Sequence, residues 1–172
     1  MKSLFKKVIG IDPGKGGGVA ILTNDTVKVY PCPREVKDMA ILIGMCLKDV
    51  APYRVKVFLE KVWAFPTDGR VGSFTFGCNY GQWQGILATY ELDPIFVTPK
   101  EWQSHFEIKK GLPKPIRKKL LKQMAIDRCP ETKKITLKTA DALLIGIYGV
   151  EAHLSHECEL PWVYPRKMEK AL

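Results

Sequence analysis

The chain has 172 residues, a length that suits one domain with its own hydrophobic core. Its 27 Lys and Arg against 18 Asp and Glu give a formal net charge of +9, which favours a polyanionic partner such as nucleic acid, and no apolar run reaches the roughly 18 residues of a membrane span. Five scattered cysteines without a CxxC pair and a short, charged N-terminus predict a cytoplasmic protein that has no secretion signal and no membrane association.

The first part of the chain is predicted to be a three-stranded antiparallel meander that leads into alternating helices and strands. Apolar alternation, turn residues and helical periodicity place strands at 7–12, 17–23 and 26–30, a helix at 35–50 and a buried strand at 55–60. Residues 63–78 contain Pro66, Gly69 and Gly72 among several aromatic side chains, and this composition predicts a loop.

The second part continues the alternation and becomes strongly basic. We predict a helix at 79–92, in which Gly81 and Gly85 permit close packing on a sheet, followed by a strand at 95–98 and helices at 99–106, 114–129 and 139–152. The inward face of the basic helix is predicted to be Ile116, Leu120, Leu121, Met124 and Ala125. This order predicts an α/β fold with a mixed five-stranded sheet and helices on both faces, formed by residues 1–152, and an extended C-terminal tail over 153–172.

Three acidic residues stand among apolar neighbours. Asp12 and Glu60 end predicted buried strands, and Asp141 opens a helix that is apolar nearly all round. Each has a simpler interpretation, because Asp12 could serve a turn, Glu60 could pair with Lys61, and Asp141 could favour the positive end of its helix. If the three carboxylates instead converge, their oxygens suit Mg²⁺ or Mn²⁺, and two such ions can assist phosphodiester cleavage.

Several segments together are similar to a known family. Val8–Gly14 with the strand after it, Val57–Val62, Thr139–Leu143, Phe76–Gly81 and Val97–Trp102 resemble the RuvC-type Holliday junction resolvases, particularly their phage-borne relatives, across roughly residues 7 to 150. The resemblance implies a ribonuclease H-like fold and a homodimer. It also implies a metal-dependent endonuclease that resolves four-way DNA junctions, with 5′-phosphate and 3′-hydroxyl products.

The resemblance also implies roles for individual residues. Asp12, Glu60 and Asp141 would hold two Mg²⁺ ions, with Mn²⁺ as a possible substitute, and Trp63 would help to open the junction, although it could also fill a core or an interface. The family usually has a fourth metal-proximal Asp or His three positions before the last acid. Here that position is Lys138, which cannot ligate a cation while charged and could either contact the scissile phosphate or lie in solvent.

A basic segment is the candidate DNA contact. Seven Lys and Arg and no acid lie between positions 109 and 122, which indicates a polyanion-binding surface, although a solvated helix face has the same composition. The residues that we expect to bind the DNA backbone are Lys100, Lys109, Lys110, Lys114, Arg117, Lys118 and Lys119.

Other functions remain open at this stage. An Asp-x-Gly hairpin also occurs in actin-like and sugar-kinase ATP binders, but that class needs a second lobe that this length does not supply. A module that binds branched nucleic acid without cutting it, or a related nuclease for RNA–DNA hybrids, fits the same pattern. The spacing of His153, His156 and Cys158 could hold zinc, but no fourth ligand is at hand.

Overall fold

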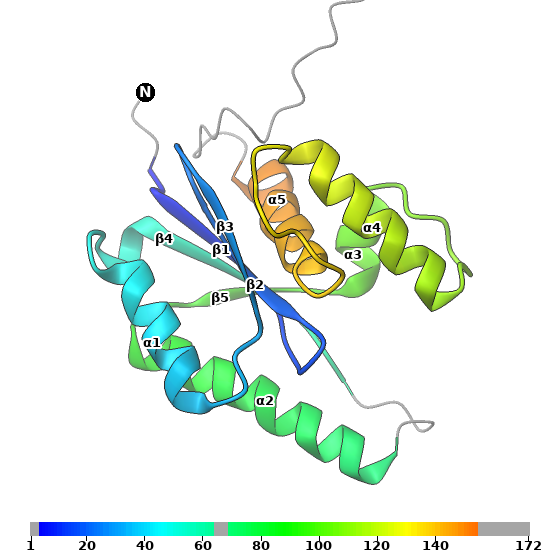
Figure 1. Ribbon diagram of the computed structural model, residues 1–172. Coiled ribbons are helices and arrows are strands. Elements are labelled where there is room, and N and C mark those ends of the chain that lie inside the picture. The colour runs from blue at the N-terminus through cyan, green and yellow to red at the C-terminus, as the bar shows by residue number, and fades with distance from the viewer. Residues whose placement is uncertain (1–3, 64–68, 155–172) are drawn as a thin grey trace, which may run out of the picture.

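A computed structural model describes residues 4–63 and 69–154 and shows one sheet between two layers of helices (Figure 1). The elements, in chain order, are β1 (Lys7–Asp12), β2 (Gly18–Thr23), β3 (Val27–Pro31), α1 (Val36–Leu47), β4 (Val55–Glu60), α2 (Arg70–Thr89), β5 (Pro94–Val97), α3 (Pro99–His105), α4 (Lys114–Arg128) and α5 (Ala140–His153), with a 3₁₀ turn at Pro52–Arg54. The predicted α/β fold with a mixed five-stranded sheet is confirmed.

The sheet has the strand order β3-β2-β1-β4-β5. β1 pairs antiparallel with β2 and parallel with β4, and β4 pairs parallel with β5. Because Ile11 lies opposite Leu59 in the parallel pair, Asp12 and Glu60 end neighbouring strands at the same edge of the sheet. This edge, at the carboxyl ends of parallel strands, is where α/β proteins usually place their sites.

Alternating side chains of the sheet build two separate hydrophobic cores. Val8 and Phe58 pack with α3, α4 and α5, whereas Ile9 and Leu59 pack with α1 and α2. The helices therefore cover both faces of the sheet, as Figure 1 shows. None of the helices in the described ranges combines the length and the apolar character that a membrane span requires.

Three glycines let α5 lie unusually close to the sheet. A Cβ built at Gly10 would sit 2.2 Å from the Ala142 carbonyl oxygen, and one at Gly149 would sit 2.2 Å from the Phe58 ring. Gly146 faces Leu22 in the same way, at 2.8 Å. Without side chains at these positions the start of α5, and with it Asp141, can approach the end of β1.

The predicted loop at 63–78 is wrong in its second half, because α2 already begins at Arg70. The buried residues of α2 are Trp83, Ile86 and Leu87, all in its C-terminal half. The N-terminal half extends past the sheet (Figure 1) and leaves Val71 and Phe74 exposed, so the sequence there shows no helical stripe of apolar residues.

One prediction about a helix face is wrong, and a second is only partly confirmed. Gly81 and Gly85 do not pack on the sheet, since both are exposed and a Cβ at either would meet no atom within 4 Å. On α4, Ile116 and Leu120 are 55% and 41% exposed. Leu121, Met124 and Ala125 do pack on the core as predicted, and Lys118 lies with them, so this orientation of α4 turns a lysine toward the start of α5.

Candidate active site

Asp12, Glu60 and Asp141 lie together at one edge of the sheet, brought there by β1, β4 and α5. Asp12 is 8% and Asp141 7% exposed, and each of the three carboxyl groups is close enough to interact electrostatically with the others. Asp12 and Asp141 are 129 positions apart in the sequence (141 − 12). In the fold they nevertheless lie close to each other.

Burial and neighbouring negative charge disfavour the ionised forms of Asp12 and Glu60. Burial raises the pKa of Asp12 well above its ordinary value of 3.8, and the negative charges of Glu60 and Asp141 raise it further, whereas Lys118 lowers it. Burial also raises the pKa of Glu60, against a hydrogen bond from Trp102 that lowers it. The interaction between the two side chains raises the pKa of Asp12 and lowers that of Glu60. Such a cluster gains most from a cation that compensates the charge.

Two side chains hold the carboxylates in place. The Trp102 indole donates a hydrogen bond to Glu60 Oε1 at 2.8 Å, and Lys118 Nζ donates to Asp141 Oδ2 at 2.7 Å. Trp102 is itself positioned because Thr98 and Glu101 form a reciprocal capping box at the start of α3, with a Thr98 side chain that accepts from the Glu101 backbone.

The donor set fits a hard divalent cation, but it is not closed around one. Among the described residues, no group of three or more His, Cys, Asp or Glu side chains is arranged so that it could hold a metal ion. Lys118 and Trp102 donate hydrogen bonds to one oxygen each of Asp141 and Glu60. The other oxygen of Asp141 is buried and has no hydrogen-bond partner, which is costly in a protein interior and is relieved by a bound cation.

The turn after Asp12 is fixed by glycines and by α2. Gly14 has a φ of +100°, and a Cβ at Gly17 would sit 2.0 Å from the Asp12 carbonyl oxygen, so neither position accepts a side chain. The backbone N–H of Gly14 donates to Asn79 Oδ1 at 2.7 Å. The carboxylate of Asp12 therefore stands on a turn that a helix on the far side of the sheet braces.

Four of the predicted DNA-binding cations surround one hollow between α3 and α4. This cavity of about 250 Å³ is lined by Lys100, Lys109, Lys110 and Arg117, and none of the described residues that line it is acidic. A neighbouring pair on α4, Lys114 and Lys119, is exposed. Lys118 differs from these, because its ammonium points to Asp141 and not to the surface hollow.

The remaining predicted site residues lie at the same edge of the sheet. Trp63 is 48% exposed three residues after Glu60. Lys138 is exposed in the connection before α5, where its carbonyl oxygen lies near Gly18 and its backbone N–H donates to Thr136 Oγ1. The zinc prediction stays untested, since His156 and Cys158 lie outside the described residues, while His153 ends α5 with its ring near Phe58.

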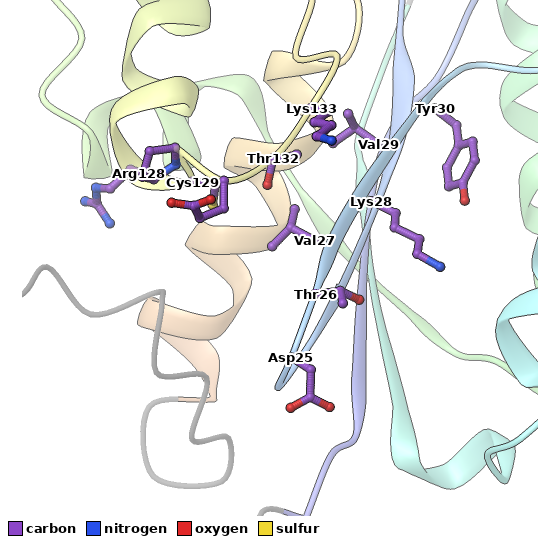
Figure 2. A pocket seen from close by; sticks show the side chains of 12 residues that line it. Asp25, Thr26, Val27, Lys28, Val29, Tyr30, Arg128, Cys129, Thr132 and Lys133 are labelled. Atoms are coloured by element: carbon purple, nitrogen blue, oxygen red, sulfur yellow. The ribbon is translucent and has the colours of Figure 1, made fainter.

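Another cavity lies away from this site. It measures about 550 Å³ and is bounded by β3 and by the connection that follows α4, with Val27 and Val29 on one wall and Thr132 and Lys133 on the other (Figure 2). None of the predicted site residues is among the described residues that line it. The candidate site is therefore recognised by its carboxylates and not by this cavity.

Comparison with known proteins identifies the fold. No protein-family model matches the chain, and no curated protein is similar to it in sequence. Among solved structures, RuvC from Thermus thermophilus matches with a TM-score of 0.57 and 16% identity, over 87% of this chain and 96% of that one. The fold is RuvC-like. A structure of T. thermophilus RuvC in complex with a Holliday junction substrate matches with the same TM-score and 14% identity, over 86% and 96% of the two chains. At these identities the RuvC likeness concerns the fold alone.

Sequence reasoning found the three carboxylates but missed the groups that position them. Trp102 and Asn79 lie in segments that resemble the family, yet nothing in a single sequence says that the indole faces Glu60 or that the amide faces Gly14. Lys118 was predicted as one of several surface cations. Lys118 lies three positions before the buried Leu121 on α4, but in a helix with this many basic residues the spacing gives no signal that it points inward.

Proposed function

We propose that the chain is a metal-dependent endonuclease that cuts four-way DNA junctions and leaves 5′-phosphate and 3′-hydroxyl ends. The observation that carries the proposal is the cluster of Asp12, Glu60 and Asp141, three carboxyl groups of which two are buried and one is half-buried, within a RuvC-like fold. The substrate is supported by the similar structure of a RuvC bound to a Holliday junction and by the net charge of +9.

The three carboxylates would hold two Mg²⁺ ions, or Mn²⁺ in their place. When bound, such ions lower the pKa of an attacking water and stabilise the leaving oxygen. Trp102 keeps the Glu60 carboxylate aimed at the cluster through its hydrogen bond of 2.8 Å. Lys118 neutralises Asp141 in the metal-free protein and, once released, supplies a positive charge beside the scissile phosphate. The exposed Lys138 would contact the same phosphate.

The basic hollow would bind the DNA backbone next to the cut. Lys100, Lys109, Lys110 and Arg117 surround it, and Lys114 and Lys119 extend the positive surface along α4. Contacts of this kind position a duplex arm without reading its sequence, and the logarithm of affinity should fall by about 0.9 per neutralised phosphate for each unit of log salt. Trp63 is exposed enough to stack on a base at the branch point.

A junction has two strands to cut, so one site per chain requires two copies related by a two-fold axis. The exposed face of α2 with Gly81 and Gly85 is our candidate for the contact between them. Small residues there would allow two helices to approach closely. Its neighbours Val71 and Phe74, which are 80% and 75% exposed, would be covered by the same contact.

The test is cleavage of labelled substrates by the purified protein. With Mg²⁺ or Mn²⁺ we expect paired nicks at symmetric positions of a four-way junction, little cutting of a linear duplex or an RNA–DNA hybrid, and no nicks with Asp12→Asn. Cutting of the hybrid in preference to the junction would contradict the junction assignment and favour another ribonuclease H-like activity.

A second function is favoured by one specific observation. Two lysines belong to the site. Lys138 occupies the fourth position, and Lys118 donates a hydrogen bond to Asp141. A chain that keeps an internal ammonium permanently in place of a metal would bind branched nucleic acid without cutting it. Tight junction binding without nicks at any divalent-ion concentration would support this function.

A further inference from the structure

A second cavity lies next to the carboxylate cluster, on the opposite side of the Asp12 turn from α5. It measures about 510 Å³ and is formed by the turn after β1, the connection between β3 and α1, and the N-terminal half of α2. This volume falls in the range of small-ligand pockets and is too confined for an intact duplex. We refer to it as the turn pocket.

The turn pocket has one flat aromatic wall. Phe76 on α2 lies against Gly14, so closely that a Cβ at Gly14 would sit 2.7 Å from the ring carbon Cε2. The ring is half-buried, and Gln82, one turn and a half further along α2, also lines the pocket with an amide that can both donate and accept a hydrogen bond. A ring and an amide in one recess suit a planar heterocycle with polar edges, which is the shape of a nucleobase.

The rim of the turn pocket is positive. Lys15 and Arg34 come from two different connections, both are exposed, and they are the charged residues among the described residues that line the cavity. Because a guanidinium and an ammonium favour a phosphate, the rim complements the other half of a nucleotide.

The turn pocket is joined to the cluster by two short links. Gly14 lies two residues after Asp12, and its N–H is held by Asn79 of the pocket wall at 2.7 Å. If a DNA strand places a phosphate at Asp12, a neighbouring nucleotide of that strand is the nearest candidate for the turn pocket. Bases next to a branch point are already poorly stacked, so withdrawing one costs less there than within a duplex.

We propose that the turn pocket binds one unstacked nucleotide of the DNA next to the cleaved phosphate, with the base against Phe76 and its phosphate between Lys15 and Arg34. The proposal rests on the proposed junction endonuclease and adds a subsite to it. The same chemistry would also accept a free mononucleotide, and the experiment separates the two sources.

The experiment has a positional part and an energetic part, both in EDTA so that the proposed cleavage cannot proceed. A junction with 5-iodouracil at single positions beside the branch point is bound and irradiated, and the crosslinked peptide is sequenced. We expect one such position to crosslink to the peptide that contains Phe76. Free 5-iodo-dUMP at the same concentration should not crosslink there, and crosslinking of the free nucleotide alone would overturn the assignment to DNA.

The energetic part measures junction affinity by fluorescence anisotropy. Phe76→Leu keeps an apolar contact with Gly14 but removes the flat ring, and Arg34→Gln removes a rim charge. Each should weaken binding about fivefold or more, whereas Lys28→Gln, an exposed cation on β3 outside the turn pocket, should change it less than about twofold. If wild type prefers the junction to a duplex and the pocket variants behave like the control, the pocket assignment is wrong. If wild type shows no preference, the proposed function itself fails.

Discussion

Replacement of Lys118 by Met is the perturbation that probes the carboxylate cluster most sharply. The variant keeps the length of the side chain and removes the ammonium that Asp141 Oδ2 receives at 2.7 Å. Asp141 then faces Asp12 and Glu60 without a counter-charge. The metal-free protein should therefore become less stable, because a buried charge has lost its partner.

The size of the effect follows from burial. Loss of one partner costs about 3–5 kcal/mol in a fully buried pair and about 0–1 kcal/mol at the surface. The Lys118 and Asp141 side chains are 22% and 10% exposed, so an intermediate cost of about 2 kcal/mol is expected. For a chain of this length that corresponds to a fall in melting temperature of roughly 4–8 °C.

Mg²⁺ should restore the lost stability, since a divalent ion that binds the carboxylates supplies the missing positive charge. Binding at about 100 times the dissociation constant contributes about 2.7 kcal/mol. Wild type must first release Lys118 from Asp141, so Mg²⁺ should raise the melting temperature of the variant more than that of wild type. Lys119→Met, on the exposed face of the same helix, is the matched control. It should change neither the melting temperature in EDTA nor its increase with Mg²⁺.

Thermal unfolding followed by circular dichroism, in EDTA and across a Mg²⁺ series, measures these differences. An equal loss of stability in EDTA and in saturating Mg²⁺ would refute the reasoning, because Lys118 would then be a packing residue. The absence of any loss in EDTA would show that the ion pair does not stabilise the cluster.

Three further outcomes are expected. In EDTA, the free energy of unfolding should fall as pH rises from about 4 through the raised pKa values of Asp12 and Glu60. The reason is that the folded state binds more protons in this range than the unfolded state. Asp12→Asn should flatten this pH dependence in pH-jump unfolding curves. Gly10→Ala should destabilise the fold by about 3 kcal/mol in urea unfolding, because its methyl group would meet the backbone of α5, whereas Gly16→Ala, with open space around it, should change stability little. Gly85→Arg should convert a dimer to a monomer in light scattering without lowering the melting temperature, and an unchanged dimer would remove α2 as the interface.

Much of the fold could be predicted because its information is local. Five strands and the order of the helices follow from periodicity and turn residues, and the position of Asp12 and Glu60 at strand ends follows directly from those strands. Where periodicity is missing, prediction was wrong. None of the described residues in the N-terminal half of α2 is fully buried, so its helical state leaves no apolar stripe in the sequence.

The site could be predicted only in outline. Its acids were found because charge at the end of an apolar strand is unusual, but the contacts of Trp102 and Lys118 depend on how α3 and α4 are rotated against α5. That rotation is set by tertiary packing, including the close approach that Gly10 and Gly146 allow. The exposure of Ile116 and the inward direction of Lys118 are two consequences of the same rotation.

The central claim is that Asp12, Glu60 and Asp141 form a divalent metal centre. Anomalous scattering from crystals soaked in Mn²⁺ tests it most directly. We predict two peaks bounded by the three carboxylates, with the Lys118 ammonium moved away from Asp141. Crystals that bind Mn²⁺ only at other places, with Lys118 still on Asp141, would contradict the claim.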